Sequence, residues 1–132
     1  MKLSPREVEL VRSTFALLEP KSGVAALAFY QRLFALDPSL RALVRGDIEA
    51  EAAQLMSLLR AATELADQPS ALRVQLLRPG ARLLRAGAEQ RAPVGEALLW
   101  SLGVTLGREF TPAARAAWAT LVAIVEENHS RL

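Results

Sequence analysis

The segment 76–87, LLRPGARLLRAG, combines a basic edge with an apolar face at helical spacing. The basic edge comprises Arg78, Arg82 and Arg85. The apolar face comprises Leu77, Ala81 and Leu84. Three guanidinium groups on one edge could bind a phosphate or a carboxylate, although such a stripe is more often a solvated helix face. The chain has a net charge of only +2 and no aromatic residues within the stripe, so we expect no nucleic-acid partner.

Glu51 is a second candidate, because it precedes Ala52 at the edge of another apolar helix face. A carboxylate that faces an apolar pocket resists ionisation, so burial preferences favour an outward, solvated side chain. Glu51 could instead accept a hydrogen bond from Tyr30 or an arginine, or anchor the polar head group of a ligand.

Residues for catalysis or metal binding are scarce. The chain has no cysteine, which excludes disulfides, thiolate catalysis and cysteine metal sites, and its single histidine is His129, near the C-terminus. The sequence contains no phosphate-binding glycine loop and no nucleophile elbow. We therefore expect that the protein is not an enzyme.

Composition is that of an ordinary globular chain. The 132 residues are 52% hydrophobic and 23% charged, which predicts a single domain over residues 1–132. The longest uncharged run, 97–107, is far shorter than the roughly 20 residues that span a bilayer. Charges alternate within the first ten residues, so no secretory segment is expected. We expect a cytoplasmic protein without a membrane span, as a monomer or homodimer.

Helix signals occur along the whole chain, and strand signals are absent. Ser4 and Glu7 form a capping box for a helix that ends before Pro20, and a second helix is expected over 22–36. A short helical turn should follow over 38–44. Asp47 should cap the next helix, whose buried face is predicted to comprise Ile48, Ala52, Leu55, Leu59, Ala62 and Ala66.

The second half continues this pattern. Ser70 should cap a helix that Pro79 breaks or kinks, and a linker follows over 87–93. Residues 94–108 are apolar almost all round, as in a central buried helix. Thr111 and Pro112 begin a last helix that should end near Asn128. The pattern predicts an all-α fold of seven to eight helices.

Three segments carry a family resemblance: FYQRLFALDPSLRALV (29–44), VGEALLWSLG (94–103) and FTPAARAAW (110–118). They resemble the bacterial single-domain globins and the haem domain of flavohaemoglobins. The resemblance extends from Leu3 to about Val125. It implies the globin fold, a three-over-three helical sandwich.

The resemblance also marks the positions that hold haem in globins. The family's spacing places the proximal, iron-ligating position at Ala81, or at Leu83 if the loop is shorter, and neither residue is a histidine. Val44 replaces the phenylalanine that stacks on haem, and Val122 replaces a tyrosine that supports the proximal histidine. The distal glutamine or histidine position is Glu51, whereas Tyr30 matches the tyrosine usual in bacterial distal pockets.

These departures predict a globin-family protein that has lost haem and binds no cofactor. It would serve as a haem-independent ligand-binding, sensory or interaction module, with a small apolar or amphipathic molecule or a protein as partner. We expect segment 76–87 to collapse partly into the former haem pocket. The candidate pocket residues are Phe29, Tyr30, Val44, Glu51, Leu55, Leu77, Ala81, Leu84, Leu98 and Val122.

The alternative interpretation is a haem-binding, gas-binding globin with unusual iron ligation. Phenolate and thioether groups ligate haem iron in some proteins, so Tyr30 and Met56 are candidate ligands. Met56 lies one residue past the inward-facing Leu55, and we expect it to pack against a neighbouring helix instead.

Overall fold

The computed structural model describes residues 2–43, 47–68, 70–71 and 94–130. All the regular elements in these ranges are helical, which confirms the all-α prediction. The α-helices are α1 (Pro5–Leu18), α2 (Ser22–Leu36), α3 (Ile48–Glu64), α6 (Val94–Leu106) and α7 (Pro112–Ser130). Short 3-10 helices are η1 (Glu19–Lys21), η2 (Pro38–Leu43) and η4 (Gly107–Glu109).

Helix starts follow the predicted capping residues. The Ser4 backbone N–H donates to Glu7 Oε1 at 2.9 Å, and the Glu7 N–H donates to Ser4 Oγ at 3.2 Å, completing the capping box of α1. Asp47 Oδ1 accepts the Glu49 N–H at 2.9 Å and so caps α3. The start of α7 is capped in the same way, by Thr111 Oγ1. These local interactions confirm three predicted helix starts.

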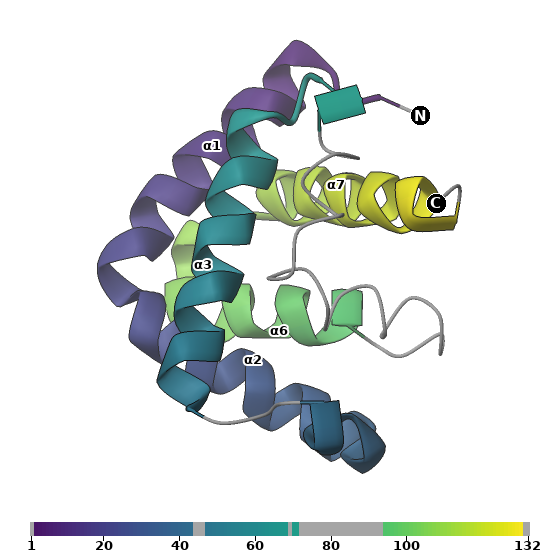
Figure 1. The fold of residues 1–132 in the computed structure, drawn as a ribbon. Coiled ribbons are helices and arrows are strands. Elements are labelled where there is room, and N and C mark those ends of the chain that lie inside the picture. Colours follow the sequence, from purple (N-terminus) through teal and green to yellow (C-terminus); the bar gives the residue numbers. More distant parts are fainter. Residues whose placement is uncertain (1, 44–46, 69, 72–93, 131–132) are drawn as a thin grey trace.

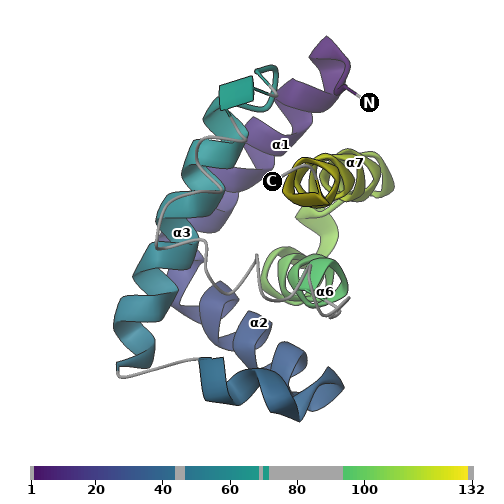
Figure 2. The same ribbon diagram turned by 45° about the vertical axis from the view of Figure 1, so that its right-hand side comes forward.

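The helices form two layers, visible in Figures 1 and 2. Helices α1, α2 and α3 form one layer, and α6 and α7 form the other. Helix α2 packs chiefly on α6, and α1 packs chiefly on α7. Between α6 and α7 the chain reverses at Gly107, whose φ of 56° suits a residue without a side chain. The arrangement is the globin fold.

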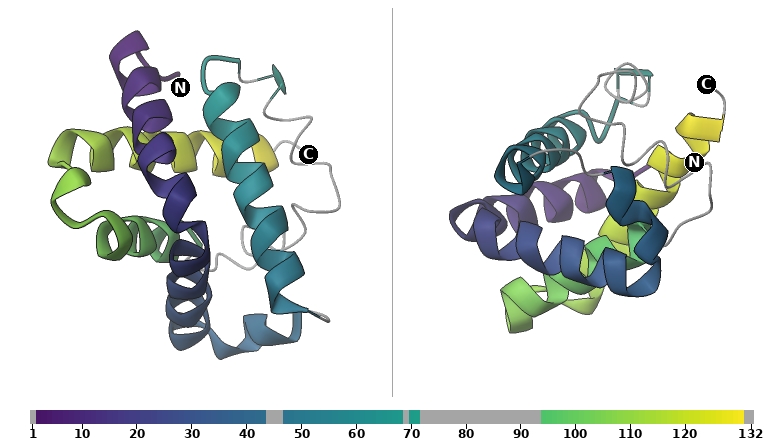
Figure 3. Two further views of the ribbon diagram at one scale, coloured as in Figure 1. Left: turned by 90° about the vertical axis from the view of Figure 1, so that its left-hand side faces the viewer. Right: turned by 60° about the horizontal axis from the view of Figure 1, so that its bottom comes forward.

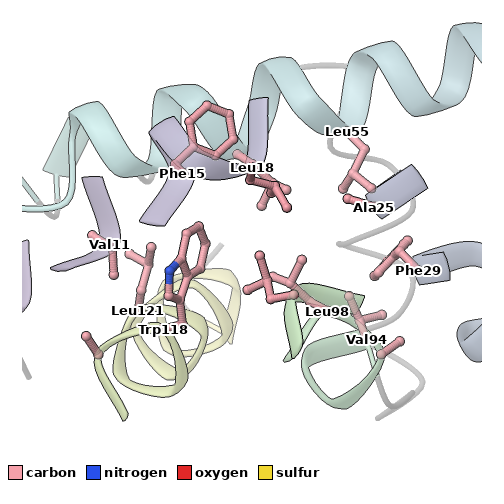
Figure 4. Close-up of a cluster of buried hydrophobic side chains, with 14 of the residues drawn as sticks. Val11, Phe15, Leu18, Ala25, Phe29, Leu55, Val94, Leu98, Trp118 and Leu121 are labelled. Atoms are coloured by element: carbon pink, nitrogen blue, oxygen red, sulfur yellow. The ribbon is translucent and has the colours of Figure 1, made fainter. Parts of the chain in front are cut away.

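The core lies between these two layers (Figure 4). Trp118 of α7 is fully buried, beside Val11 and Leu121. Close to Trp118 lie Phe15 and Leu18 of α1, which are also buried. Their packing couples the N-terminal helix to the C-terminal helix across the whole sequence.

Two polar contacts fix α3 alongside the end of α1. Arg12 Nε donates to the Thr63 carbonyl at 3.0 Å, and Arg12 Nη2 donates to the Glu64 carbonyl at 2.7 Å. Both carbonyls belong to the last turn of α3, and the Thr63 carbonyl also accepts the Ala66 N–H at 3.4 Å, so Arg12 supplements the backbone hydrogen bonds at the C-terminus of α3. An ion pair between Glu19 and Arg60 joins η1 to the same helix.

The buried faces differ from prediction in two helices. Ile48 was predicted to be buried, but it is 44% exposed, because the first turn of α3 extends beyond the core. Leu58 and Thr63 are buried although they lie outside the predicted face. In α6, predicted to be buried all round, Trp100 and Val104 are exposed because one side of this helix faces outward.

Among the described residues, no helix combines the length and apolarity needed to cross a bilayer.

Candidate functional site

Four predicted pocket residues belong to the buried core between the layers: Phe29, Tyr30, Leu55 and Leu98. Figure 4 shows Phe29 of α2, Leu55 of α3 and Leu98 of α6 directed toward the same interior region. Val122 of α7 is partly buried and packs against this core from its own helix. Glu51 lies in the first turn of α3 and is partly exposed.

The other predicted site residues lie outside the described part of the chain. They are Val44, Leu77, Ala81 and Leu84 of the pocket, and Arg78, Arg82 and Arg85 of the basic stripe. The predicted collapse of segment 76–87 and the break at Pro79 fall in the same undescribed range.

Tyr30 is the buried polar residue of the cluster. Its ring contacts Phe29 edge-to-face, with centroids 5.1 Å apart, and stacks on Phe34 with centroids 5.8 Å apart. Burial, together with the negative charge of Glu51, raises the pKa of Tyr30 to about 12. The phenol therefore keeps its proton at neutral pH and can act as a hydrogen-bond donor.

A groove between α2 and α3, which we call the α2–α3 groove, was not predicted from the sequence. One hollow of about 670 Å³ lies between the facing helices, and another of about 860 Å³ extends toward η2. Both are lined by Leu27, Tyr30 and Ile48. Met56 lines the first hollow and packs against the core edge, in agreement with the prediction that it contacts a neighbouring helix.

Within the described residues, no three side chains of histidine, cysteine, aspartate or glutamate lie close enough together to hold a metal ion. The single histidine of the sequence is His129, and its side chain lies outside the described set.

Comparison with known proteins gives the relationship. No family model matches the chain. It is 29% identical to neuroglobin of Chaenocephalus aceratus over 94% of this chain and 88% of that protein. It is 28% identical to neuroglobin of Tetraodon nigroviridis, over 98% of this chain and 92% of that protein. It is 29% identical to neuroglobin of Danio rerio, over 94% of this chain and 88% of that protein. The chain is related to the globins. The matches do not support the finer resemblance to bacterial single-domain globins or to flavohaemoglobins.

The globin relationship corrects the cofactor expectation. Globins hold haem, so the matches to neuroglobins point to haem and contradict the expectation that no cofactor binds. That expectation rested on Ala81, Val44 and Val122 at positions given by the family's spacing, and on His129 being the single histidine of the chain. Haem affinity also comes from burial of the porphyrin against apolar walls, so these substitutions alone do not decide whether haem binds.

The described residues fit a haem in their chemistry. Phe29, Leu55 and Leu98 supply apolar surface of the kind that packs against a porphyrin, and they come from three different helices. Tyr30 supplies a protonated hydroxyl within the same cluster. In haem proteins, the polarity, hydrogen-bond donors and steric access of the distal pocket decide between oxygen binding, oxygen activation and electron transfer.

Proposed function

We propose that this globin relative binds haem and, on the side of Tyr30, a small diatomic gas. The observation that carries the proposal is the similarity to neuroglobins over nearly the whole chain. Bound haem would supply the iron to which the gas binds. The proposed role is binding rather than catalysis.

Tyr30 is the proposed hydrogen-bond donor to the bound gas. Its pKa of about 12 keeps the phenol protonated, and two phenylalanine rings restrict its orientation. A donor held in place before the gas arrives loses little conformational entropy on binding. Glu51 contributes because its negative charge opposes loss of the phenolic proton.

The iron ligand in this proposal is not Tyr30 or Met56. Tyr30 is the hydrogen-bond donor in this proposal, and Met56 lines the α2–α3 groove. The chain has one histidine, so the ligand is either His129 or a group other than imidazole. Replacing His129 with alanine separates these cases through the absorption and magnetic resonance spectra of the haem-loaded protein.

The other interpretation drawn from the sequence is a haem-independent ligand-binding, sensory or interaction module. The matches to neuroglobins favour haem binding over it.

The test of the gas-binding role is the rate of oxygen dissociation from the haem-loaded chain, compared with Tyr30→Phe. Loss of one hydrogen bond to the bound gas, about 0.5–1.5 kcal/mol, should raise this rate by about twofold to tenfold. Carbon monoxide, a weaker hydrogen-bond acceptor, should dissociate at a nearly unchanged rate. Equal oxygen dissociation rates in the two proteins would show that Tyr30 does not contact the gas.

A further inference from the structure

The first hollow of the α2–α3 groove, with a volume of about 670 Å³, lies between two walls that contain small residues. Figure 3 (left) shows α2 and α3 side by side. Four lining residues carry a methyl group or less: Gly23 and Ala26 of α2, and Ala52 and Ala53 of α3. A Cβ atom added to Gly23 would meet nothing within 4 Å beyond its own turn of helix. The two helices therefore leave open space between these residues.

The hollow extends from the surface of the molecule to the side chain of Tyr30. At the surface, Leu27 is 56% exposed and Ile48 is 44% exposed. Tyr30 lines the same hollow but is only 3% exposed, so it lies at the inner end. The Tyr30 ring also contacts Phe29 of the buried core edge-to-face. Tyr30 therefore lies between the hollow and the core region in which the proposed function places the bound gas.

The lining of the hollow suits a small neutral molecule. Most of its side chains are apolar, and the charged residue among those described is Glu49, at the exposed start of α3. A carboxylate repels an anion but acts only weakly on a diatomic gas, which carries no net charge. Oxygen, carbon monoxide and nitric oxide also prefer apolar surroundings to water. The hollow is far larger than the roughly 30 Å³ that one water molecule takes up, and a diatomic gas is of similar size.

We propose that the first hollow is the main route by which a diatomic gas passes between solvent and the buried side of Tyr30. The inference rests on the proposed function, because it concerns the gas that the haem-loaded chain would bind. The route runs between the small residues of α2 and α3 and ends at Tyr30, the proposed hydrogen-bond donor. Tyr30 thus contributes both to the path of the gas and to its binding.

A route has a kinetic signature that a binding contact lacks. Narrowing the route raises one barrier that entry and exit share, so the association and dissociation rates fall by the same factor. The equilibrium affinity stays constant, because the bound and free states are unchanged. Loss of a contact to the bound gas, as in Tyr30→Phe with oxygen, changes the affinity instead.

The test is laser photolysis of carbon monoxide from the haem-loaded chain, with displacement by nitric oxide giving the dissociation rate. Ala53→Trp and Leu27→Trp each place an indole in the hollow, from opposite walls. Each variant should lower both carbon monoxide rates by the same factor, about threefold to tenfold. The matched controls are Ala50→Trp and Val24→Trp, at exposed positions of the same helices outside the hollow. These controls should keep the rates of the unmodified chain.

A second measurement needs no haem. Dissolved oxygen is paramagnetic and increases the nuclear magnetic relaxation rate of methyl groups that it reaches. In the haem-free chain it should relax the methyl group of Ala26, which lines the hollow, more strongly than that of Ala117, an equally buried alanine of the core. Ala53→Trp should abolish this difference, whereas Ala50→Trp should preserve it.

Several results would overturn the route. They are equal relaxation of the Ala26 and Ala117 methyl groups in the unmodified chain, unchanged carbon monoxide rates in both Ala53→Trp and Leu27→Trp, and a fall in the association rate alone. Circular dichroism establishes that each variant is folded. A haem-loaded chain that binds no carbon monoxide would contradict the proposed function and the route together, whereas unchanged rates with carbon monoxide bound would contradict the route alone.

Discussion

Tyr30 of α2 and Glu51 of α3 are coupled electrostatically across the gap between their helices. Burial is the larger cause of the raised pKa of Tyr30, about 12, and the negative charge of Glu51 adds to it. The coupling links the proposed gas-side donor to α3. Hydrogen bonds from Arg12 of α1 and the ion pair between Arg60 and Glu19 also fix the position of this helix.

Glu51→Gln should lower the pKa of Tyr30 while leaving it above 10. The variant removes the negative charge, but burial, the larger cause of the shift, remains. Because Tyr30 is the only tyrosine of the chain, ultraviolet absorbance against pH reports this group alone. Glu49→Gln, a neighbouring carboxylate absent from the causes of the shift, is the control. A pKa equal to that of the unmodified chain would contradict the coupling.

Tyr30 should also make the protein less stable in alkali. Its folded-state pKa is raised above the value of about 10 expected for the unfolded chain, so between pH 10 and pH 12 the unfolded chain binds fewer protons. The free energy of unfolding should therefore fall as pH rises through this range. Two pKa units correspond to about 2–3 kcal/mol.

Urea unfolding of the unmodified chain and of Tyr30→Phe at several pH values isolates this contribution. The free-energy difference between the two proteins should change across pH 10–12 and stay constant below pH 9. A constant difference over the whole range would contradict the prediction.

Trp118→Ala should lower the free energy of unfolding by about 3–5 kcal/mol, because a fully buried indole leaves a cavity between α1 and α7. The chain has one other tryptophan, Trp100, which is 38% exposed and contacts the Arg32 guanidinium. Trp100→Ala should cost about 1 kcal/mol. Urea titrations compare the two, and similar losses would show that the core is not centred on Trp118.

Arg12→Gln should lower the free energy of unfolding by about 1 kcal/mol. The variant loses charge-assisted hydrogen bonds to the last carbonyls of α3, and the partial exposure of Arg12 limits their strength. Arg6→Gln, an exposed arginine on the same helix, is the control and should have little effect. Equal urea midpoints for the two variants would exclude a stabilising role for this cap.

The sequence predicted features that depend on neighbouring residues. The caps at Ser4, Asp47 and Thr111 were correct because each involves residues two or three positions apart. The Arg12 cap of α3 was missed because its partners lie more than 50 residues away. Sequence spacing alone does not reveal such a contact.

The candidate site was predictable only in part. Phe29, Tyr30, Leu55 and Leu98 are buried in the core, but Val44, Leu77, Ala81 and Leu84 lie outside the described residues, so the pocket stays a prediction. The α2–α3 groove depends on how two helices pack side by side, so the positions of Leu27 and Ile48 in the sequence did not predict it. The expected loss of haem rested on the replaced pocket residues and on His129 as the single histidine, and the neuroglobin matches contradict it.

Haem binding is tested most directly by titrating the purified, haem-free chain with hemin and recording the visible absorption spectrum. We predict a sharp Soret band that saturates at one haem per chain. His129→Ala, titrated in parallel, shows whether imidazole is the iron ligand. A weak, broad band that never saturates with the unmodified chain would contradict the proposed function.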